Sequence, residues 1–385
     1  MLNRIRALAR RSRPAARPDS GLRHVAALSA SALDAYVRAS DLEAMLGDVG
    51  HPLLGTTTQE RLLDLLTGER LGDLSVPARA RVVAALQTGA TLSVAEHAVV
   101  RVFEATTAED DLRLLRNLCD GDGTHQDLAK LLFSDIDDEA VRARILDHIA
   151  AHAGTHGGLK ILSDVDDTLV SNLKDRLFPR GTIYPGAIAF YTGLDRGPAS
   201  TENPLGDVTF VTARPSDPFG LFESGTHRMV RARGIGSATV LSGSLLNLLP
   251  HGSMAEKKLQ NVEQYARLFP DYGIIFIGDN GQGDVAVAER IVAERRDAVR
   301  AVFIHAVVPS TERERERLAR LGITVIDTFV GAAVHARELG LLSPTQVDEV
   351  VADARDAMSE IRFADAEAER GARAELDRDL AAATR

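Results

Sequence analysis

Cysteine, aromatic residues and long apolar runs are all scarce in this chain of 385 residues. The single cysteine, Cys119, excludes an internal disulfide framework and any metal site built from several cysteines. Aromatic residues make up 4% of the chain and tryptophan is absent, so we expect no stacking platform for single-stranded nucleic acid and no nucleic-acid partner. No segment approaches the ~18 consecutive apolar residues that a membrane-spanning helix needs. What remains is globular composition at a length that predicts two or three domains.

Positive charge is also in short supply. Lys and Arg total 45 against 55 Asp and Glu, which gives a formal net charge of -10 at pH 7. An acidic protein does not attract anions by its overall field, so it needs local cations or a metal ion to handle an anionic substrate. Residues 1–23 are the exception, because they hold seven arginines and one acidic residue, Asp19. We interpret this basic flexible arm either as a solvated tail or as a contact to an anionic lipid surface.

The same arginines interrupt every apolar run near the N-terminus, so the segment does not resemble a secretory signal. Without an export signal or disulfides, the expected location is cytoplasmic. Contact of the arm with a membrane would make the protein peripheral there.

Residues 24–153 show helical periodicity almost throughout. Apolar residues recur at i, i+3 and i+4 in four stretches, namely 61–68, 77–87, 93–105 and 109–119. Long alternating runs of β-branched residues are absent. We therefore predict an all-α domain over 24–153, whose role and protein partner the sequence does not indicate.

The pattern changes after a glycine-rich joint at 151–158. Short apolar runs then alternate with helical stretches, and the six runs are 159–162, 208–211, 238–241, 274–277, 301–304 and 323–326. Buried strands alternating with helices predict an α/β domain with a Rossmann-like parallel sheet and helices on both faces, over 159–343. The Ala/Glu/Arg-rich stretch 344–385 predicts a charged, solvated C-terminal helix.

Two aspartates, Asp164 and Asp166, directly follow the first predicted strand. In an open α/β sheet, ligands bind at the carboxyl ends of the strands. Two carboxylates one residue apart at such an end can divide the chemistry, the first as a nucleophile and the second as a general acid and base.

A near copy of this motif, LLFSDIDD, occupies residues 131–138. Helical spacing of apolar residues follows it, and no strand pattern leads into it. We therefore interpret the copy as structural, with Asp135 or Asp137 as the N-cap of a helix.

Further polar residues follow other predicted strands. Thr212 ends the second one, and Asp279 and Asp284 lie in a glycine-rich turn after 274–277. Between them, Lys257 and Lys258 begin a helix, and we favour Lys258 because it starts the apolar face of that helix.

Carboxylates, a hydroxyl and a lysine at one sheet edge favour transfer of a phosphoryl group. A carboxylate attacking a phosphate meets repulsion of about 4 kcal/mol per pair of unit charges at 4 Å and an effective dielectric of 20. Mg²⁺ prefers hard oxygen ligands and offsets this repulsion, while an ammonium and a hydroxyl stabilise the phosphoryl oxygens. The sequence therefore predicts a magnesium-dependent enzyme acting on a phosphorylated substrate.

In order and spacing, these motifs resemble the haloacid dehalogenase superfamily of phosphohydrolases. The resemblance implies the fold of that superfamily, and the short stretch 171–183 leaves room only for a minimal cap. It also implies that Asp164 is the nucleophile that forms an aspartyl-phosphate and that Asp166 protonates the leaving group and then activates water. Thr212 and the lysine would bind the phosphoryl group.

The same resemblance implies the magnesium ligands. They would be Asp164, Asp279, Asp284 and the backbone carbonyl of Asp166.

Several segments also resemble the catalytic domain of the actin-patch phosphatidate phosphatases and their bacterial relatives: SDVDDT, the YPG turn, FIGDNGQGD and AVFIHAV. This narrower resemblance implies phosphatidate as the substrate. One departure is that the family's Ser-Asn-Ser-Pro stretch is replaced here by Thr212-Ala213-Arg214-Pro215. Two alternatives stay open: a phosphatase of a soluble nucleotide, sugar phosphate or phosphoprotein, and an interaction protein with a vestigial phosphatase domain.

Overall fold

The computed structural model describes residues 18–46, 57–87, 93–120, 128–155, 158–199, 208–211, 238–241 and 254–384. Thr212 and most of the arm 1–23 lie outside these ranges. The chain divides into two compact units, and the division does not follow chain order. One unit comprises Met1–Leu115 and Asp135–His148, and the other Arg116–Ser134 and Ile149–Arg385. Residues 116–134 therefore group with the second half of the chain.

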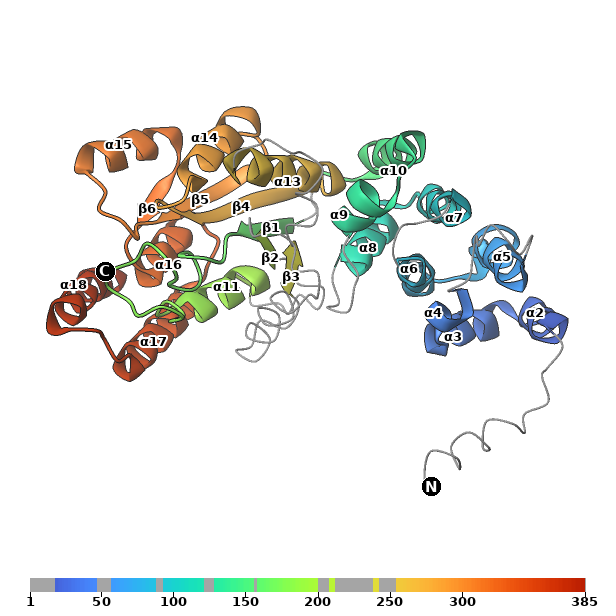
Figure 1. Ribbon diagram of the computed structural model, residues 1–385, viewed down its shortest axis with the longest axis horizontal. Helices are drawn as coiled ribbons and strands as arrows, with labels where there is room; N and C mark the ends of the chain where they lie inside the picture. The colour runs from blue at the N-terminus through green and yellow to red at the C-terminus, as the bar shows by residue number, and fades with distance from the viewer. Residues whose placement is uncertain are drawn as a thin grey trace, which may run out of the picture. The chain divides into compact units, whose positions relative to one another are not determined.

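Every element described before residue 153 is helical (Figure 1). The α-helices are α2 (Pro18–Ala26), α3 (Ala30–Ala39), α4 (Leu42–Leu46), α5 (Thr58–Asp64), α6 (Val76–Ala85), α7 (Ser93–Glu104), α8 (Glu109–Asp120), α9 (Leu128–Lys130) and α10 (Glu139–His152). Three short turns of other helical types are η1 (Leu65–Glu69), η2 (Leu71–Asp73) and η3 (Leu131–Asp135). The helical periodicity was thus a sound guide to these elements.

The second unit contains a six-stranded parallel sheet of order β3-β2-β1-β4-β5-β6. Its strands are β1 (Gly158–Ser163), β2 (Val208–Val211), β3 (Ala238–Leu241), β4 (Tyr272–Asp279), β5 (Val299–His305) and β6 (Thr324–Ile326). The prediction of an α/β unit with a parallel sheet is confirmed. All six apolar runs form strands because parallel strands are buried on both faces and so need continuous apolar sequence.

Helices flank this sheet. They are α11 (Ala187–Arg196), α13 (Met254–Leu268), α14 (Asp284–Glu294), α15 (Glu312–Leu321), α16 (Phe329–Glu338), α17 (Pro344–Glu360) and α18 (Ala366–Ala383). In Figure 1, α13, α14 and α15 lie along one side of the strands, and α11, α16 and α17 along the other. The core on the latter side includes Phe190, whose ring lies 5.6 Å from those of Phe303 and Phe329.

The prediction of one solvated C-terminal helix over 344–385 was wrong. The structure has two helices there, α17 and α18, separated by residues 361–365. The Asp365 side chain accepts hydrogen bonds from the backbone N–H groups of Glu367 and Ala368, at 2.9 Å each, and so begins a new helix after the extended residue Ile361. Moreover, α17 buries Val350 and Ala354 in the core, so it is not a solvated helix.

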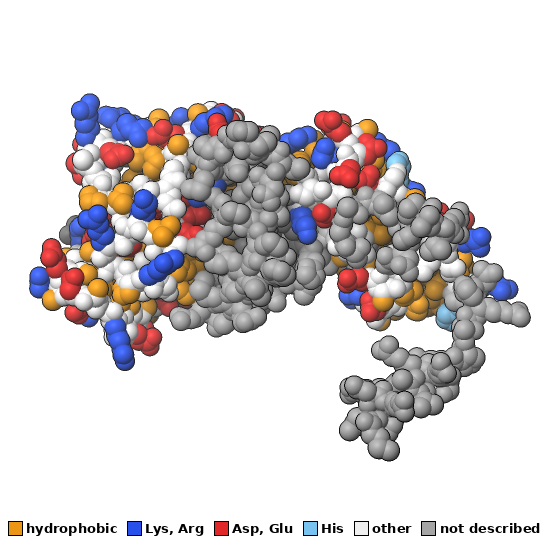
Figure 2. All heavy atoms as spheres, in the orientation of Figure 1, with side chains coloured by type: hydrophobic (Ala, Val, Ile, Leu, Met, Phe, Trp, Pro, Cys, Tyr) orange, Lys and Arg blue, Asp and Glu red, His pale blue; other side chains and the backbone are white. Residues whose placement is uncertain are grey.

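No helix in the described part of the chain combines the length and the apolar character needed to cross a bilayer. Figure 2 shows basic and acidic side chains interspersed on the visible, described surface of the sheet-containing unit. On this face the excess of acidic residues forms no single patch.

Candidate active site

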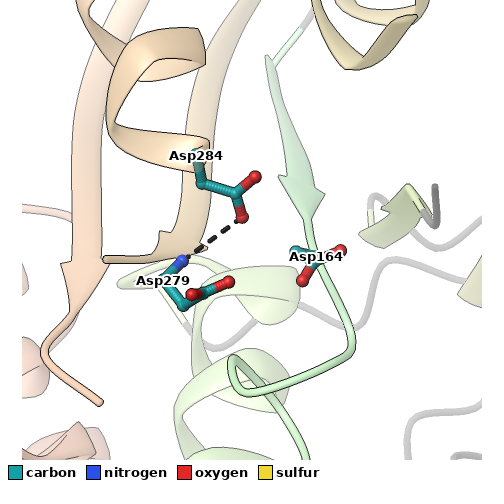
Figure 3. A group of neighbouring side chains, drawn as sticks. All are labelled: Asp164, Asp279 and Asp284. Atoms are coloured by element: carbon teal, nitrogen blue, oxygen red, sulfur yellow. Dashed lines mark hydrogen bonds between the residues drawn. The ribbon is translucent and has the colours of Figure 1, made fainter. Parts of the chain in front are cut away.

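Three buried aspartates meet at the carboxyl edge of the sheet (Figure 3). Asp164 follows β1, Asp279 ends β4, and Asp284 begins α14. One carboxylate oxygen from each lies within 4.8 Å of the others, and the three residues are 5%, 0% and 0% exposed. β1 and β4 are paired neighbours, so residues that follow one strand and end the other lie side by side.

The local backbone explains why these three side chains converge. The Asp164 N–H donates to the Ile277 carbonyl at 2.9 Å, which extends the β1–β4 pairing to Asp164. Asp284 folds back toward β4, where its Oδ2 accepts from the Asp279 N–H at 3.3 Å. Gly278 makes this possible, because a Cβ there would lie only 2.6 Å from the Asp284 side chain. Gly278 was not identified as a site residue from the sequence, although it directly follows the predicted strand 274–277 and precedes Asp279.

Lys258, on α13, completes the cluster. Its Nζ lies 3.0 Å from Asp164 Oδ1 and 2.5 Å from Asp284 Oδ1, and the residue is 5% exposed. The structure thus brings the favoured lysine to the carboxylates, whereas the side chain of Lys257 lies outside what the structure describes.

Burial and mutual repulsion control the protonation of this cluster. Burial raises the pKa of Asp164 well above its usual value, and the Asp284 and Asp279 carboxylates raise it further, against the opposing charge of Lys258. Burial and Asp284 raise the pKa of Asp279 to about 7. Burial alone would lower the pKa of Lys258, but Asp164 and Asp284 outweigh it, so the pKa is raised. The carboxylates therefore need more positive charge nearby than Lys258 alone provides. Lys258 itself stays protonated, because its pKa is raised.

One buried carboxylate oxygen in the cluster accepts no hydrogen bond. Asp279 Oδ1 accepts from the Gly281 N–H at 2.6 Å, but Oδ2 has no hydrogen-bond partner although it is buried. In Figure 3 the Asp279 carboxylate points toward Asp164. A buried oxygen left in this state is unfavourable, and a cation between the carboxylates would satisfy it. The residues present thus fit a hard divalent cation.

Asp166, two residues after Asp164, is not one of the three carboxylates of this cluster. It is half-buried, and its Oδ1 accepts a hydrogen bond from Asn172 Nδ2 at 2.8 Å. Thr212 lies outside the described residues, so its predicted contact with the phosphoryl group stays a prediction.

Asp167, the third aspartate of the motif, was passed over in the sequence. It adopts a left-handed backbone conformation with φ of 60° and is fully buried. Its carboxylate accepts hydrogen bonds from the backbone N–H groups of residues 172–174, at 2.7 to 3.1 Å. His305 Nδ1 lies 3.1 Å from the Asp167 carbonyl oxygen, so this nitrogen carries a proton and donates. Asp167 therefore shapes the loop that follows the motif.

The near copy at 131–138 follows no strand, and η3 covers its first part. The capping residue was predicted incorrectly: neither Asp135 nor Asp137 caps α10. Asp138 does so, because its Oδ1 accepts from the N–H groups of Ala140 at 2.8 Å and Val141 at 3.3 Å. Asp137 instead donates its backbone N–H to Glu96 at 2.7 Å.

Residues 159–306 match the protein family described as the catalytic domain of the phosphatidate phosphatase APP1. No curated protein and no solved structure matches the chain. The match contains all the candidate site residues. It confirms the predicted resemblance and, with it, the prediction of a phosphatase-type enzyme.

Proposed function

We propose that this protein is a Mg²⁺-dependent phosphomonoester hydrolase that works through an aspartyl-phosphate, with phosphatidate as its favoured substrate. The observation that carries the proposal is the buried cluster of Asp164, Asp279, Asp284 and Lys258 at the ends of neighbouring parallel strands. The match of residues 159–306 supports the substrate class. The proposal includes a haloacid dehalogenase fold with a minimal cap over 159–343. The all-α domain predicted over 24–153 is kept only for the part that does not group with the sheet-containing unit, 24–115 and 135–148.

Asp164, Asp279 and Asp284 would hold the metal ion, together with the backbone carbonyl of Asp166 as the resemblance implies. The unsatisfied Oδ2 of Asp279 supports this assignment. When bound, Mg²⁺ supplies positive charge that offsets the repulsion between these carboxylates and a phosphate and polarises the phosphoryl oxygens.

The chain's own residues would divide the reaction between them. An Asp164 oxygen forms a bond to phosphorus while the bond from phosphorus to the leaving oxygen breaks, and Asp166 gives that oxygen its proton. Asp166 then takes a proton from the water that attacks the aspartyl-phosphate, which releases phosphate and restores Asp164. Lys258, with Thr212, holds phosphoryl oxygens as they gain charge.

A substrate panel with and without Mg²⁺ tests the proposal on the wild-type protein and Asp164→Asn. The expected loss of kcat in the variant is about 10⁴-fold or more, because the nucleophile is gone. Its circular dichroism should match the wild type. Retained turnover in a folded Asp164→Asn protein would contradict the mechanism.

Thermal unfolding provides a readout of the metal without activity. At a Mg²⁺ concentration of 100 times its dissociation constant, binding should stabilise the folded wild type by about 2.7 kcal/mol and so raise its Tm. Asp279→Asn should remove this effect, since it replaces the carboxylate that holds the unsatisfied oxygen. An equal shift in both proteins would contradict the assigned ligands.

A phosphatase of soluble monoesters is a second candidate. The stretch Thr212-Ala213-Arg214-Pro215, which differs from the phosphatidate phosphatase pattern, favours it. Comparing phosphatidate in vesicles with soluble nucleotide, sugar and peptide phosphates separates the two candidates. If no phosphate ester is turned over with Mg²⁺, the alternative of an interaction protein with a vestigial phosphatase domain gains support.

The substrate bears on membrane contact. A phosphatidate phosphatase acts at a membrane surface, so we propose that this protein, expected in the cytoplasm, contacts the membrane peripherally through the basic arm 1–23. Flotation with phosphatidate vesicles, comparing the full chain with one that lacks residues 1–17, tests this contact. Equal flotation of both would contradict a role of the arm.

A further inference from the structure

The segment directly after the aspartate motif forms a closed flap, which we define as residues 171–183. Its two ends are held together by the Ser171 N–H donating to the Thr182 carbonyl at 2.9 Å and the Gly181 N–H donating to the Ser171 carbonyl at 2.7 Å. Val170 and Ile183 form an antiparallel bridge at its base. The flap therefore stands in a defined position beside Asp166.

The buried Asp167 side chain holds the beginning of the flap in place. Its carboxylate accepts the N–H groups of Asn172 at 2.7 Å and Lys174 at 3.0 Å, and Gln282 Nε2 donates to it at 3.1 Å from the turn after β4. The backbone of Asn172 is thus held by a buried carboxylate, which determines where its side chain begins.

The Asn172 side chain lies between a carboxylate and a guanidinium. Its Nδ2 donates to Asp166 Oδ1 at 2.8 Å, and its Oδ1 accepts from Arg180 Nε at 2.8 Å. Turning the amide over would place its oxygen against the Asp166 carboxylate and its NH₂ group against the guanidinium. Both hydrogen bonds would be lost, because a carboxylate only accepts and a guanidinium only donates. An ionised Asp166 and Arg180 thus favour the same orientation of the amide. When Asp166 is protonated it can also donate, and Arg180 is then the group that selects this orientation.

We propose that Asn172 is a positioning residue for Asp166 and that Arg180 acts through Asn172 by fixing the orientation of its amide. This inference rests on the proposed function, in which Asp166 delivers a proton to the leaving oxygen. Proton transfer requires the donor within hydrogen-bond reach of the acceptor, so an Asp166 carboxyl group that rotates away protonates the leaving oxygen less often. Loss of Asn172 should therefore impair the departure of leaving groups that need a proton.

The test compares kcat/KM for p-nitrophenyl phosphate, whose leaving group needs little protonation, with kcat/KM for an alkyl phosphate such as glycerol 2-phosphate. This constant includes all steps up to the loss of the leaving group. For Asn172→Ala we expect a fall of about 10-fold or more on the alkyl ester, a part of the 10²–10⁴-fold that general acids contribute. The fall on the aryl ester should be under about 3-fold, since acid catalysis matters little there.

Arg180→Met should show the same selectivity at smaller size. The double variant should be no slower than Asn172→Ala, because Arg180 acts through Asn172. Arg176→Met is the matched control: it removes another exposed flap arginine and should leave both constants unchanged.

Each result leads to a distinct conclusion. A fall of equal size on both esters, or none in either variant, would overturn the positioning role while the phosphatase function stands. If Asn172→Ala does not fold, the exposed Arg180→Met substitution decides the question alone. If the wild type hydrolyses neither these esters nor phosphatidate with Mg²⁺, the proposed function itself fails and this inference with it.

Discussion

Lys258 places a buried ammonium between the carboxylates of Asp164 and Asp284, at 3.0 and 2.5 Å. With Asp279 nearby, three acidic groups share this cation. The ammonium has two tasks in the proposed reaction, since it offsets repulsion between the carboxylates and stabilises the charge that develops on phosphoryl oxygens.

Lys258→Met should lower kcat/KM by about 10²–10³-fold, the usual effect of removing one group that stabilises charge in the transition state. It should also lower the Tm without Mg²⁺, because two buried carboxylates lose their partner. Mg²⁺ should restore part of that stability. Steady-state kinetics and thermal unfolding with and without Mg²⁺ measure these effects.

Lys257→Met is the comparison, because the sequence left both lysines open. It should keep near-wild-type kinetics. Loss of activity in Lys257→Met with retention in Lys258→Met would reverse the assignment.

At the scale of elements, the strands were predictable because each is a short apolar run. The limits shifted slightly, as where the run 274–277 became β4, Tyr272–Asp279. The division of the C-terminal stretch into α17 and α18 was not predictable from composition, since Ala, Glu and Arg are common on both sides of the break. A single capping residue, Asp365, made the difference.

The residues of the candidate site were predictable to a similar extent. Asp164, Asp279 and Asp284 could be found because they follow strands, and strand ends meet at one edge of a parallel sheet. The structural roles of Asp167 and Asn172 were not visible in the sequence, because they depend on contacts with side chains and backbone that only the folded loop brings together.

Helix α18 carries a half-buried carboxyl group with an unusual affinity for protons. Burial, together with the charges of Asp327, Asp175 and Asp379 and against that of Arg378, raises the pKa of Glu375 from about 4.5 to about 7. When folding raises the pKa of a group, the protonated group stabilises the folded protein in full at any pH below the pKa of the unfolded state. Here this contribution is lost as the pH rises through about 7.

Glu375→Gln should therefore weaken the fall in Tm between pH 5 and pH 8, because glutamine stays uncharged throughout. Thermal unfolding across this range measures the difference. Glu369→Gln, which removes an exposed partner of Arg373 on the same helix, should follow the wild-type curve. Parallel curves for wild type and Glu375→Gln would show that Glu375 does not titrate in this range.

At the scale of the whole molecule, a buried ion pair joins segments that are far apart in the sequence. Arg116, in the second half of α8, donates two hydrogen bonds to the carboxylate of Asp271, at 2.7 and 2.8 Å, and both side chains are fully buried. Asn117 donates to the Tyr272 hydroxyl at 2.6 Å and accepts from Lys160 at 2.8 Å. The sequence assigned this part of α8 to the helical domain because periodicity reports only local structure.

Arg116→Met should reduce the free energy of unfolding by about 3–5 kcal/mol, because it leaves Asp271 as an unpaired buried charge. Arg113→Met, one turn earlier on α8, removes a partly exposed pair with Glu109 and Asp110 and should change stability by at most about 1 kcal/mol. Chemical denaturation of both variants provides the measurement. Equal losses in the two would contradict a special role of the buried pair.

The chain passes between the two units at three points, 115/116, 134/135 and 148/149. Each point lies inside a helical element, in α8, η3 and α10 respectively. The boundary therefore contains no irregular linker at these points for a protease to enter, and one cut leaves two covalent connections in place. For genetic recombination the consequence is similar: a single crossover exchanges neither unit by itself.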